Sequence, residues 1–237
     1  DGGNFSTDSI FPDRDGGGLP GLTYQSDLVV VGSSGTDYMN LNKNREANGS
    51  DDPFSSGDWN ISLGEGDDSI LVKLKNGDSL DMGAGDDNAG MAYMGFYGTP
   101  SAADAAFTKL DGGAGNDILG FGSSAEENQV LRLSMGGAVN FENLSGSYVG
   151  ETLIGDAKAN KIAGGRSSGG GVDTLYGLSG DDELFAGGWA FFNRSSDSEI
   201  LRYVNDRNNT DDDVLFGGQG NDALYGSVGD NTLDGGE

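Results

Sequence analysis

The sequence predicts an all-β solenoid of short strands, with long loop insertions and at most one or two short helices. Three observations support this prediction. A nine-residue pattern recurs along much of the chain, only 35% of the 237 residues are hydrophobic, and 44 residues are glycine. A chain this poor in apolar residues is not expected to form a thick core. Stacked repeats need only a thin seam of Leu and Ile, because each repeat packs on its neighbours.

The clearest copy of the pattern runs from Gly217 to Tyr225 and reads G-G-Q-G-N-D-A-L-Y. It has glycine at positions 1, 2 and 4, Asp at position 6 and an apolar residue at position 8. Glycine permits positive φ, so the turn carbonyls can converge on one point. Asp222 brings negative charge to that point, and calcium prefers roughly six to eight oxygen ligands. Leu224 is expected to face inward from a short strand.

This pattern resembles the RTX, or hemolysin-type, calcium-binding nonapeptide repeat of secreted bacterial proteins. The resemblance implies a parallel β-roll or β-helix solenoid, in which each calcium ion lies between a repeat and the next but one. It also implies several Ca²⁺ ions per chain. An extracellular or bacterial cell-surface location, reached by type I secretion, is typical of this family.

The copies in residues 1–145 are scattered, so an interrupted solenoid with insertions is expected there. They begin at Gly3, Gly32, Leu63, Met82 and Gly112. Their sixth positions hold Asp8, Asp37, Asp68, Asp87 and Asp117. In the first copy, Ile10 takes the inward position.

Other segments of this half predict elements outside the repeat. Residues 28–31 form an apolar run that predicts a buried strand. Further strands are expected at 70–74, 130–133 and 141–144. Residues 101–110 predict a helix, because Ser101 can cap it and alanines favour it.

Residues 146–237 predict a regular calcium-binding β-roll. Its units begin at Gly146, Gly155, Gly164, Gly177 and Gly217, and Gly226 opens a further copy. The 31 residues between Ala186 and Phe216 are interpreted as one repeat that carries a loop at 189–209. This loop is rich in aromatic residues, which either cap the flank of the solenoid or bind a sugar or a partner.

The resemblance places the sixth residues of the regular half in two columns. One contains Glu151, Asp173, Asp213 and Asn231, and the other contains Asn160, Asp182 and Asp222. The pairs Asp173–Asp213 and Asp182–Asp222 are the strongest, while the Glu and Asn positions depart from the family's Asp. The candidate calcium ligands of the chain are Asp37, Asp68, Asp87, Gly112, Gly115, Asp117, Asp173, Gly177, Gly180, Asp182, Asp213, Gly217, Gly220 and Asp222.

Charge and composition exclude several functions. The net charge is −26, from 39 acidic and 13 basic residues, and bound divalent cations would relieve this repulsion. Nucleic acid and anionic membranes are poor partners for such a chain. The absence of Cys and His removes zinc sites and His-based catalysis. No apolar run is long enough for a transmembrane helix.

The remaining catalytic motifs are weak, and the chain is expected not to be an enzyme. Residues 165–169 match the G-x-S-x-G of serine hydrolases, but no His can serve as the base. Acidic pairs such as Asp181–Asp182 are explained by the repeat better than by a glycosidase dyad.

The sequence therefore predicts a calcium-binding structural module of a secreted or cell-surface bacterial protein: an adhesin, surface-layer or filament subunit. Copies of the chain itself or a surface glycan are candidate partners. Two alternatives stay open, namely an export and folding module of a secreted lipase, protease or polysaccharide epimerase, and a carbohydrate-binding module. Because D-G-G stands near both ends, the chain is expected to be a fragment of a longer protein.

Overall fold

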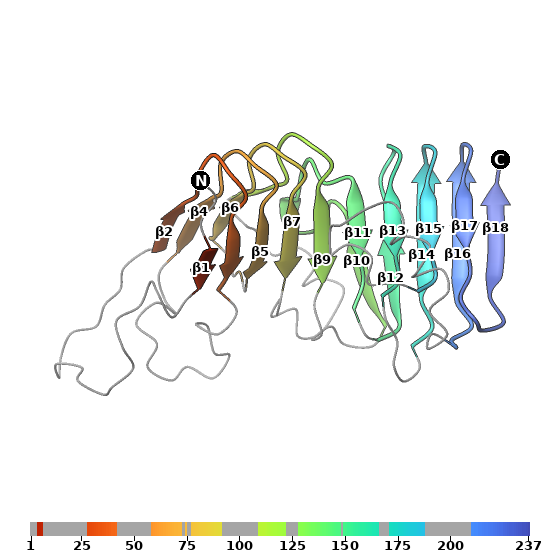
Figure 1. Ribbon diagram of the computed structural model, residues 1–237. Helices are drawn as coiled ribbons and strands as arrows, with labels where there is room; N and C mark the ends of the chain where they lie inside the picture. Colours follow the sequence, from red (N-terminus) through yellow and green to blue (C-terminus); the bar gives the residue numbers. More distant parts are fainter. Residues whose placement is uncertain are drawn as a thin grey trace, which may run out of the picture.

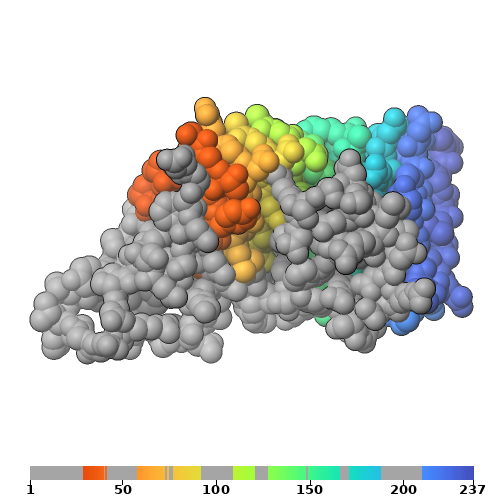
Figure 2. Space-filling model, in the orientation of Figure 1, coloured from red at the N-terminus to blue at the C-terminus, as the bar shows by residue number. Residues whose placement is uncertain are grey.

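The protein is an all-β solenoid of parallel strands, as predicted (Figure 1). The computed structural model describes residues 4–6, 28–41, 58–72, 74, 77–91, 109–121, 128–147, 149–165, 171–187 and 210–237. Each coil consists of one strand, a glycine-rich turn, a second strand, and a return segment to the next coil. In these ranges the strands follow one another along the axis from β1 and β2 at one end to β17 and β18 at the other. Figure 2 shows the same order of the coils at the surface.

One face of the solenoid is a nine-stranded sheet that spans its whole described length, in the order β1-β3-β5-β7-β9-β11-β13-β15-β17. Its strands are β1 (Asn4–Ser6), β3 (Tyr38–Asn40), β5 (Ser69–Val72), β7 (Asn88–Met91), β9 (Ile118–Phe121), β11 (Asn143–Ser145), β13 (Lys161–Ala163), β15 (Glu183–Phe185) and β17 (Ala223–Tyr225).

The opposite face consists of two shorter sheets. The four-stranded sheet contains β2 (Leu28–Val31), β4 (Trp59–Ser62), β6 (Ser79–Asp81) and β8 (Lys109–Asp111). The five-stranded sheet contains β10 (Gln129–Arg132), β12 (Glu151–Ile154), β14 (Thr174–Ser179), β16 (Val214–Gln219) and β18 (Thr232–Gly236). Between these sheets, Val139 forms an isolated parallel bridge with Asp111.

The core is the thin seam that the eighth position of the repeat predicts. On the nine-stranded face, parallel pairing aligns one apolar residue from each coil, and the aligned residues are Phe5, Met39, Ile70, Ala89, Leu119, Leu144, Ile162, Leu184 and Leu224. The opposite face contributes a matching row that includes Ile61, Leu80, Leu153, Leu175 and Leu215. Most of these side chains are buried. Burial of one such side chain stabilises the fold by about 1.5–3 kcal/mol.

The coils stack so closely that several turn positions accept only glycine. At Gly83, φ is +104°, and a Cβ atom would lie 1.9 Å from the carbonyl oxygen of Gly64 in the preceding coil. A left-handed backbone and this contact both exclude larger residues. Leu178 departs from the rule, because it stands at position 2 of its unit with φ +79° and an exposed side chain.

The structure corrects two predictions in the first copies. Backbone pairing aligns Phe5 with Met39, so the strand of the first copy lies at Asn4–Ser6 and is registered on Phe5, not on Ile10. That copy has glycine only at its first position, and a single glycine does not fix the register when another apolar residue can pack inward. Asp8 and Ile10 lie outside the described residues. Strand β2 exists, but Val29 and Val31 are exposed, while Val30 between them packs against the core.

Two further predictions differ from the structure. Lys109 and Leu110, expected at the end of a helix, lie in β8, where Leu110 pairs with the core residue Leu80. Inward packing of Leu110 favours a strand at these two residues. Residues 101–108, which include the alanines, lie outside the described part. The strand expected at 141–144 begins only at Asn143, because a longer turn with a 3-10 segment at Met135–Gly137 precedes it.

Candidate metal-binding turns

The turns bring the sixth residues of successive coils together in two columns along the edges of the solenoid. The first column leads into the nine-stranded sheet and contains Asp37, Asp68, Asp87, Asp117, Glu142, Asn160, Asp182 and Asp222. The second column leads into the opposite face and contains Asp78, Glu151, Asp173, Asp213 and Asn231. The residues expected in each column of the regular half lie in that column.

A repeated hydrogen bond joins neighbouring members of a column. The backbone N–H of Asp182 donates to Oδ1 of Asp222 at 2.9 Å, one coil further on. The N–H of Asp173 donates in the same way to Oδ1 of Asp213 at 2.9 Å. In the first half of the chain, Asp37 donates to Asp68 at 2.8 Å. Each carboxylate therefore uses one oxygen to hold the preceding coil.

At several of these positions the second carboxylate oxygen has no hydrogen-bond partner. Among the described residues, Oδ2 of Asp68, Asp117, Asp182 and Asp222 is buried and accepts no hydrogen bond. Burial of a charged oxygen without a partner is costly, so a polar or cationic partner is expected at such an atom. These oxygens are hard ligands of the kind that calcium prefers. The site chemistry therefore fits a calcium ion.

Glycine at the first position makes room for the second oxygen. A Cβ atom on Gly177 would lie 2.3 Å from Oδ2 of Asp182, and one on Gly217 would lie 2.4 Å from Oδ2 of Asp222. The other glycines predicted as ligands, Gly112, Gly115, Gly180 and Gly220, lie in the same turns as Asp117, Asp182 and Asp222. Their contribution would come from backbone carbonyls.

The aspartates cannot enclose a cation by themselves. In the part of the chain that the structure describes, no three acidic side chains gather to form a metal site. A calcium ion in these turns would therefore need backbone carbonyls as well as carboxylates, which agrees with the glycine-rich turns.

Burial opposes the charge of these aspartates. Burial raises the pKa of Asp173 to about 9, against the hydrogen bond from the Glu151 N–H, and the nearby charges of Glu151 and Asp213 raise it further. Burial likewise raises the pKa of Asp117 to about 7 and that of Asp182 to about 6. A bound cation would reverse this effect, because it favours the ionised form of its ligands.

The raised pKa values predict an inverted pH dependence of stability. In calcium-free buffer the folded chain holds protons on Asp173 from the ordinary value of 3.8 up to about 9, so stability is present at low pH and lost as pH rises. We expect the calcium-free chain to keep more of its strand signal in circular dichroism at pH 5 than at pH 8. With saturating calcium the order should reverse, because protons compete with the metal. Calcium should be removed from the buffers with a resin, because the affinity of chelators for calcium itself depends on pH. The same change of stability with pH in the presence and absence of calcium would contradict this prediction.

Sequence reasoning missed two members of the columns. Asp78 is fully buried and accepts the backbone N–H of Trp59 through Oδ1 at 2.9 Å. The spacing Asp78-Ser79-Leu80 matches positions 6 to 8 of the repeat and could have revealed it. Glu142 stands nine residues before Glu151, at the sixth position of a degenerate unit that begins at Gly137 and has Leu144 at its eighth position, so the period of nine could have revealed it as well.

Comparison with known proteins agrees with the turn geometry. The family described as RTX calcium-binding nonapeptide repeat (4 copies) matches residues 109–123, 167–188 and 208–237. These ranges include the turns that end at Asp117, Asp182 and Asp222. No curated protein matches the chain. Over the described residues, no helix is long and apolar enough to cross a membrane.

Proposed function

We propose that this chain, which carries RTX calcium-binding nonapeptide repeats, is a calcium-dependent structural module of a secreted or cell-surface bacterial protein, such as an adhesin, surface-layer or filament subunit. The supporting observation is that successive aspartates of the first column, from Asp68 to Asp222, accept a backbone N–H of the preceding coil through one oxygen. At Asp182 and Asp222 the other oxygen is buried and has no hydrogen-bond donor. When bound, calcium supplies the positive charge that these oxygens need. The solenoid flanks offer long surfaces for contact with copies of the chain or with a glycan.

The proposed ligands are the carboxylates of both columns together with turn carbonyls. The carboxylates are those of Asp37, Asp68, Asp87, Asp117, Asp173, Asp182, Asp213 and Asp222, and Asp78 joins them from the structure. The carbonyls are those of Gly112, Gly115, Gly177, Gly180, Gly217 and Gly220. We also propose that residues 146–237 form the regular calcium-binding part and residues 1–145 the interrupted part.

The repeat family is a structural calcium-binding family and not a catalytic one. We propose that this chain has no catalytic activity of its own. Ser167, the serine of the G-x-S-x-G match, lies outside the described residues. Secretion is typical of RTX proteins, and export by a type I system is part of the proposal.

The assignment is tested by Asp182→Ala and Asp222→Ala. The two residues are neighbours in the first column, joined by the hydrogen bond from the Asp182 N–H to Oδ1 of Asp222. On the proposal that both carboxylates ligate one ion, each single variant should lose one tight calcium ion in calorimetry. The double variant should lose little more, because both carboxylates act on the same ion. Asp181→Ala is the matched control: its Oδ1 accepts the Asn221 N–H on the exposed side of the same turn, at 2.8 Å. Full calcium stoichiometry in both single variants would refute the assigned ligands.

A further inference from the structure

We infer that a metal-free belt crosses the middle of the solenoid and divides the calcium columns into two separate blocks. The belt consists of Glu142, Ser147, Glu151, Asp156, Lys158 and Asn160. This inference rests on the proposed function, because it states which turns of the calcium-binding module do not take the metal. Its basis is that the carboxylate and amide oxygens of the belt already have hydrogen-bond or ion-pair partners within the protein.

Asn160 closes the turn 155–160 with its own amide group. Its Oδ1 accepts the backbone N–H of Asp156 at 2.8 Å. Its Nδ2 donates to the carbonyl oxygen of Glu142 in the preceding coil at 3.0 Å, and to Oδ1 of Asp156 at 3.2 Å. An amide N–H₂ group is a donor and cannot ligate a cation. In this turn the amide therefore holds its own turn and the preceding coil together without a cation.

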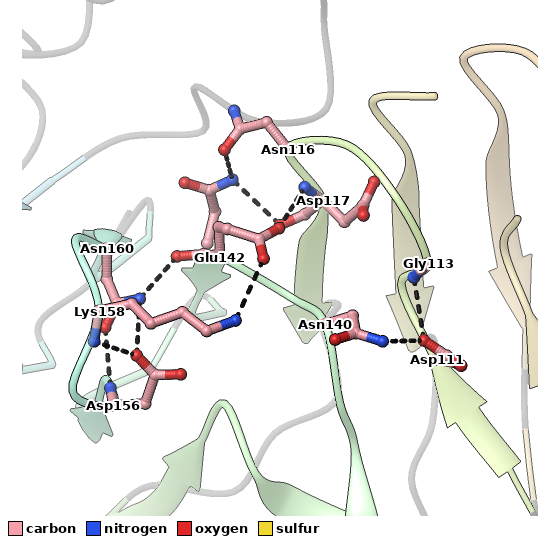
Figure 3. A network of polar contacts seen from close by, with 10 residues as sticks. Asp111, Gly113, Asn116, Asp117, Asn140, Glu142, Asp156, Lys158 and Asn160 are labelled. Carbon is pink, nitrogen blue, oxygen red and sulfur yellow. Dashed lines mark hydrogen bonds and ion pairs between the residues drawn. The ribbon is translucent and has the colours of Figure 1, made fainter. Parts of the chain in front are cut away.

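Glu142 and Lys158 complete the closure on the same side (Figure 3). Oε2 of Glu142 accepts the backbone N–H of Asp117 at 3.0 Å, and Oε1 lies 3.6 Å from the Lys158 ammonium group. Both oxygens of this carboxylate thus have partners. Lys158 stands at the fourth position of its unit, where the repeat has glycine, and brings a positive charge to the column. The protein supplies at this level the charge that calcium would supply elsewhere.

The opposite edge of the solenoid is closed at the same level. Glu151 begins β12, and the turn closed by Asn160 follows that strand. Oε2 of Glu151 accepts the backbone N–H of Ser147 at 2.8 Å, and Oε1 accepts the Ser147 hydroxyl at 2.6 Å. Both edges of one coil are therefore satisfied without a metal.

Asn231 shows that this closure is a recurring device. Its Nδ2 donates to the carbonyl oxygens of Ser227 and Gly229, at 3.1 and 2.9 Å. These are carbonyls of its own turn, of the kind that an ion would need. In contrast, Asp182 and Asp222 each retain a buried oxygen without a donor. The turns of Asn160 and Asn231 are therefore closed by their own amides, whereas those of Asp182 and Asp222 keep an oxygen for a cation.

The belt separates two groups of calcium turns. In the first column, Asp68 and Asp117 lie before it and Asp182 and Asp222 lie after it, and each of the four keeps an oxygen without a donor. In the second column, Asp173 and Asp213 lie after it. Calcium binding by one group of turns should therefore not require calcium binding by the other. The strands of the belt still pair with those of both neighbouring coils, so the sheet is continuous between the groups.

The test compares Asn160→Ala with Asp182→Ala in the whole chain. Calorimetry gives the number of bound ions, and unfolding at several calcium concentrations gives the slope of stability against log calcium, which reports the ions lost on unfolding. Asn160→Ala should lower stability without changing either number. Asp182→Ala should lower the count by one and flatten the slope. If Asn160→Ala does not fold, Lys158→Gln serves the same purpose, because it removes only the ammonium charge.

A gain of binding provides the second arm. The double variant Lys158→Gly with Asn160→Asp restores the glycine and Asp of the repeat, and should bind one more calcium ion than the wild type. Asn221→Asp is the control, because it adds a carboxylate at the exposed fifth position and should add no tight site. A wild type that binds no calcium would refute the proposed function. If the wild type binds calcium, two results would refute the belt. One is the loss of an ion in Asn160→Ala or Lys158→Gln, and the other is the absence of an additional ion in the double variant.

Discussion

Removal of calcium is expected to abolish most of the β structure of this chain. The folded state gathers buried carboxylates in two columns within a chain of net charge −26, and its core is only a thin seam. Each site that binds only the folded state adds about 2.7 kcal/mol at a 100-fold excess of ligand. Several sites together match the whole stability of a typical domain, about 5–15 kcal/mol.

Circular dichroism in excess chelator provides the measurement. The strand signal should disappear, at least for residues 146–237, and should return when calcium is added in excess of the chelator. Magnesium is a suitable control, because it prefers a small octahedral site and retains its water ligands. An unchanged spectrum and melting temperature after verified calcium removal would show that the solenoid is stable without the ion.

The columns could be predicted because the repeat fixes the positions of the Asp in the turn and of the apolar residue on the following strand. The spacing from Asp to the apolar residue places one on the turn and the other on the inward face, and this relation is local. Once Leu184 and Leu224 are paired in the sheet, Asp182 and Asp222 must lie one coil apart. The same logic fails where the glycines are missing. Phe5 and Ile10 both offer an apolar residue, and the spacing does not decide which of them is aligned with Met39.

The closed turns could be predicted only in part, because their closure depends on contacts between coils. The replacement of Asp by Asn160 marks a weakened unit in the sequence. Nothing in the sequence shows, however, that its amide reaches the carbonyl of Glu142, or that Lys158 lies beside that carboxylate. Glu142 itself lies on the period, nine residues before Glu151, but the period does not reveal which atoms its carboxylate contacts. Such contacts depend on how the insertion folds against the neighbouring coil.

Replacement of Gly113 by alanine is expected to be among the most disruptive single changes in the chain. Gly113 has φ +97°, and a Cβ atom there would lie 1.8 Å from the carbonyl oxygen of Gly83. The left-handed backbone costs roughly 1–2 kcal/mol for a residue other than glycine. The contact with backbone cannot be relieved by a side-chain rotation, and overpacking of this kind costs about 1–3 kcal/mol more. We therefore expect a loss of about 2–5 kcal/mol in the free energy of unfolding at saturating calcium.

Two glycines of the same chain separate the two causes. Gly137 has φ +81° with nothing within 4 Å of its Cβ position, so Gly137→Ala should show the backbone cost alone. Gly235 also has nothing within 4 Å, and it lacks a left-handed φ, so Gly235→Ala should be nearly neutral. The order Gly113, Gly137, Gly235 in denaturant unfolding is the expected result. If Gly113→Ala costs no more than Gly137→Ala, the coils have room to separate, and the close stacking that carries the calcium columns is not a constraint on this solenoid.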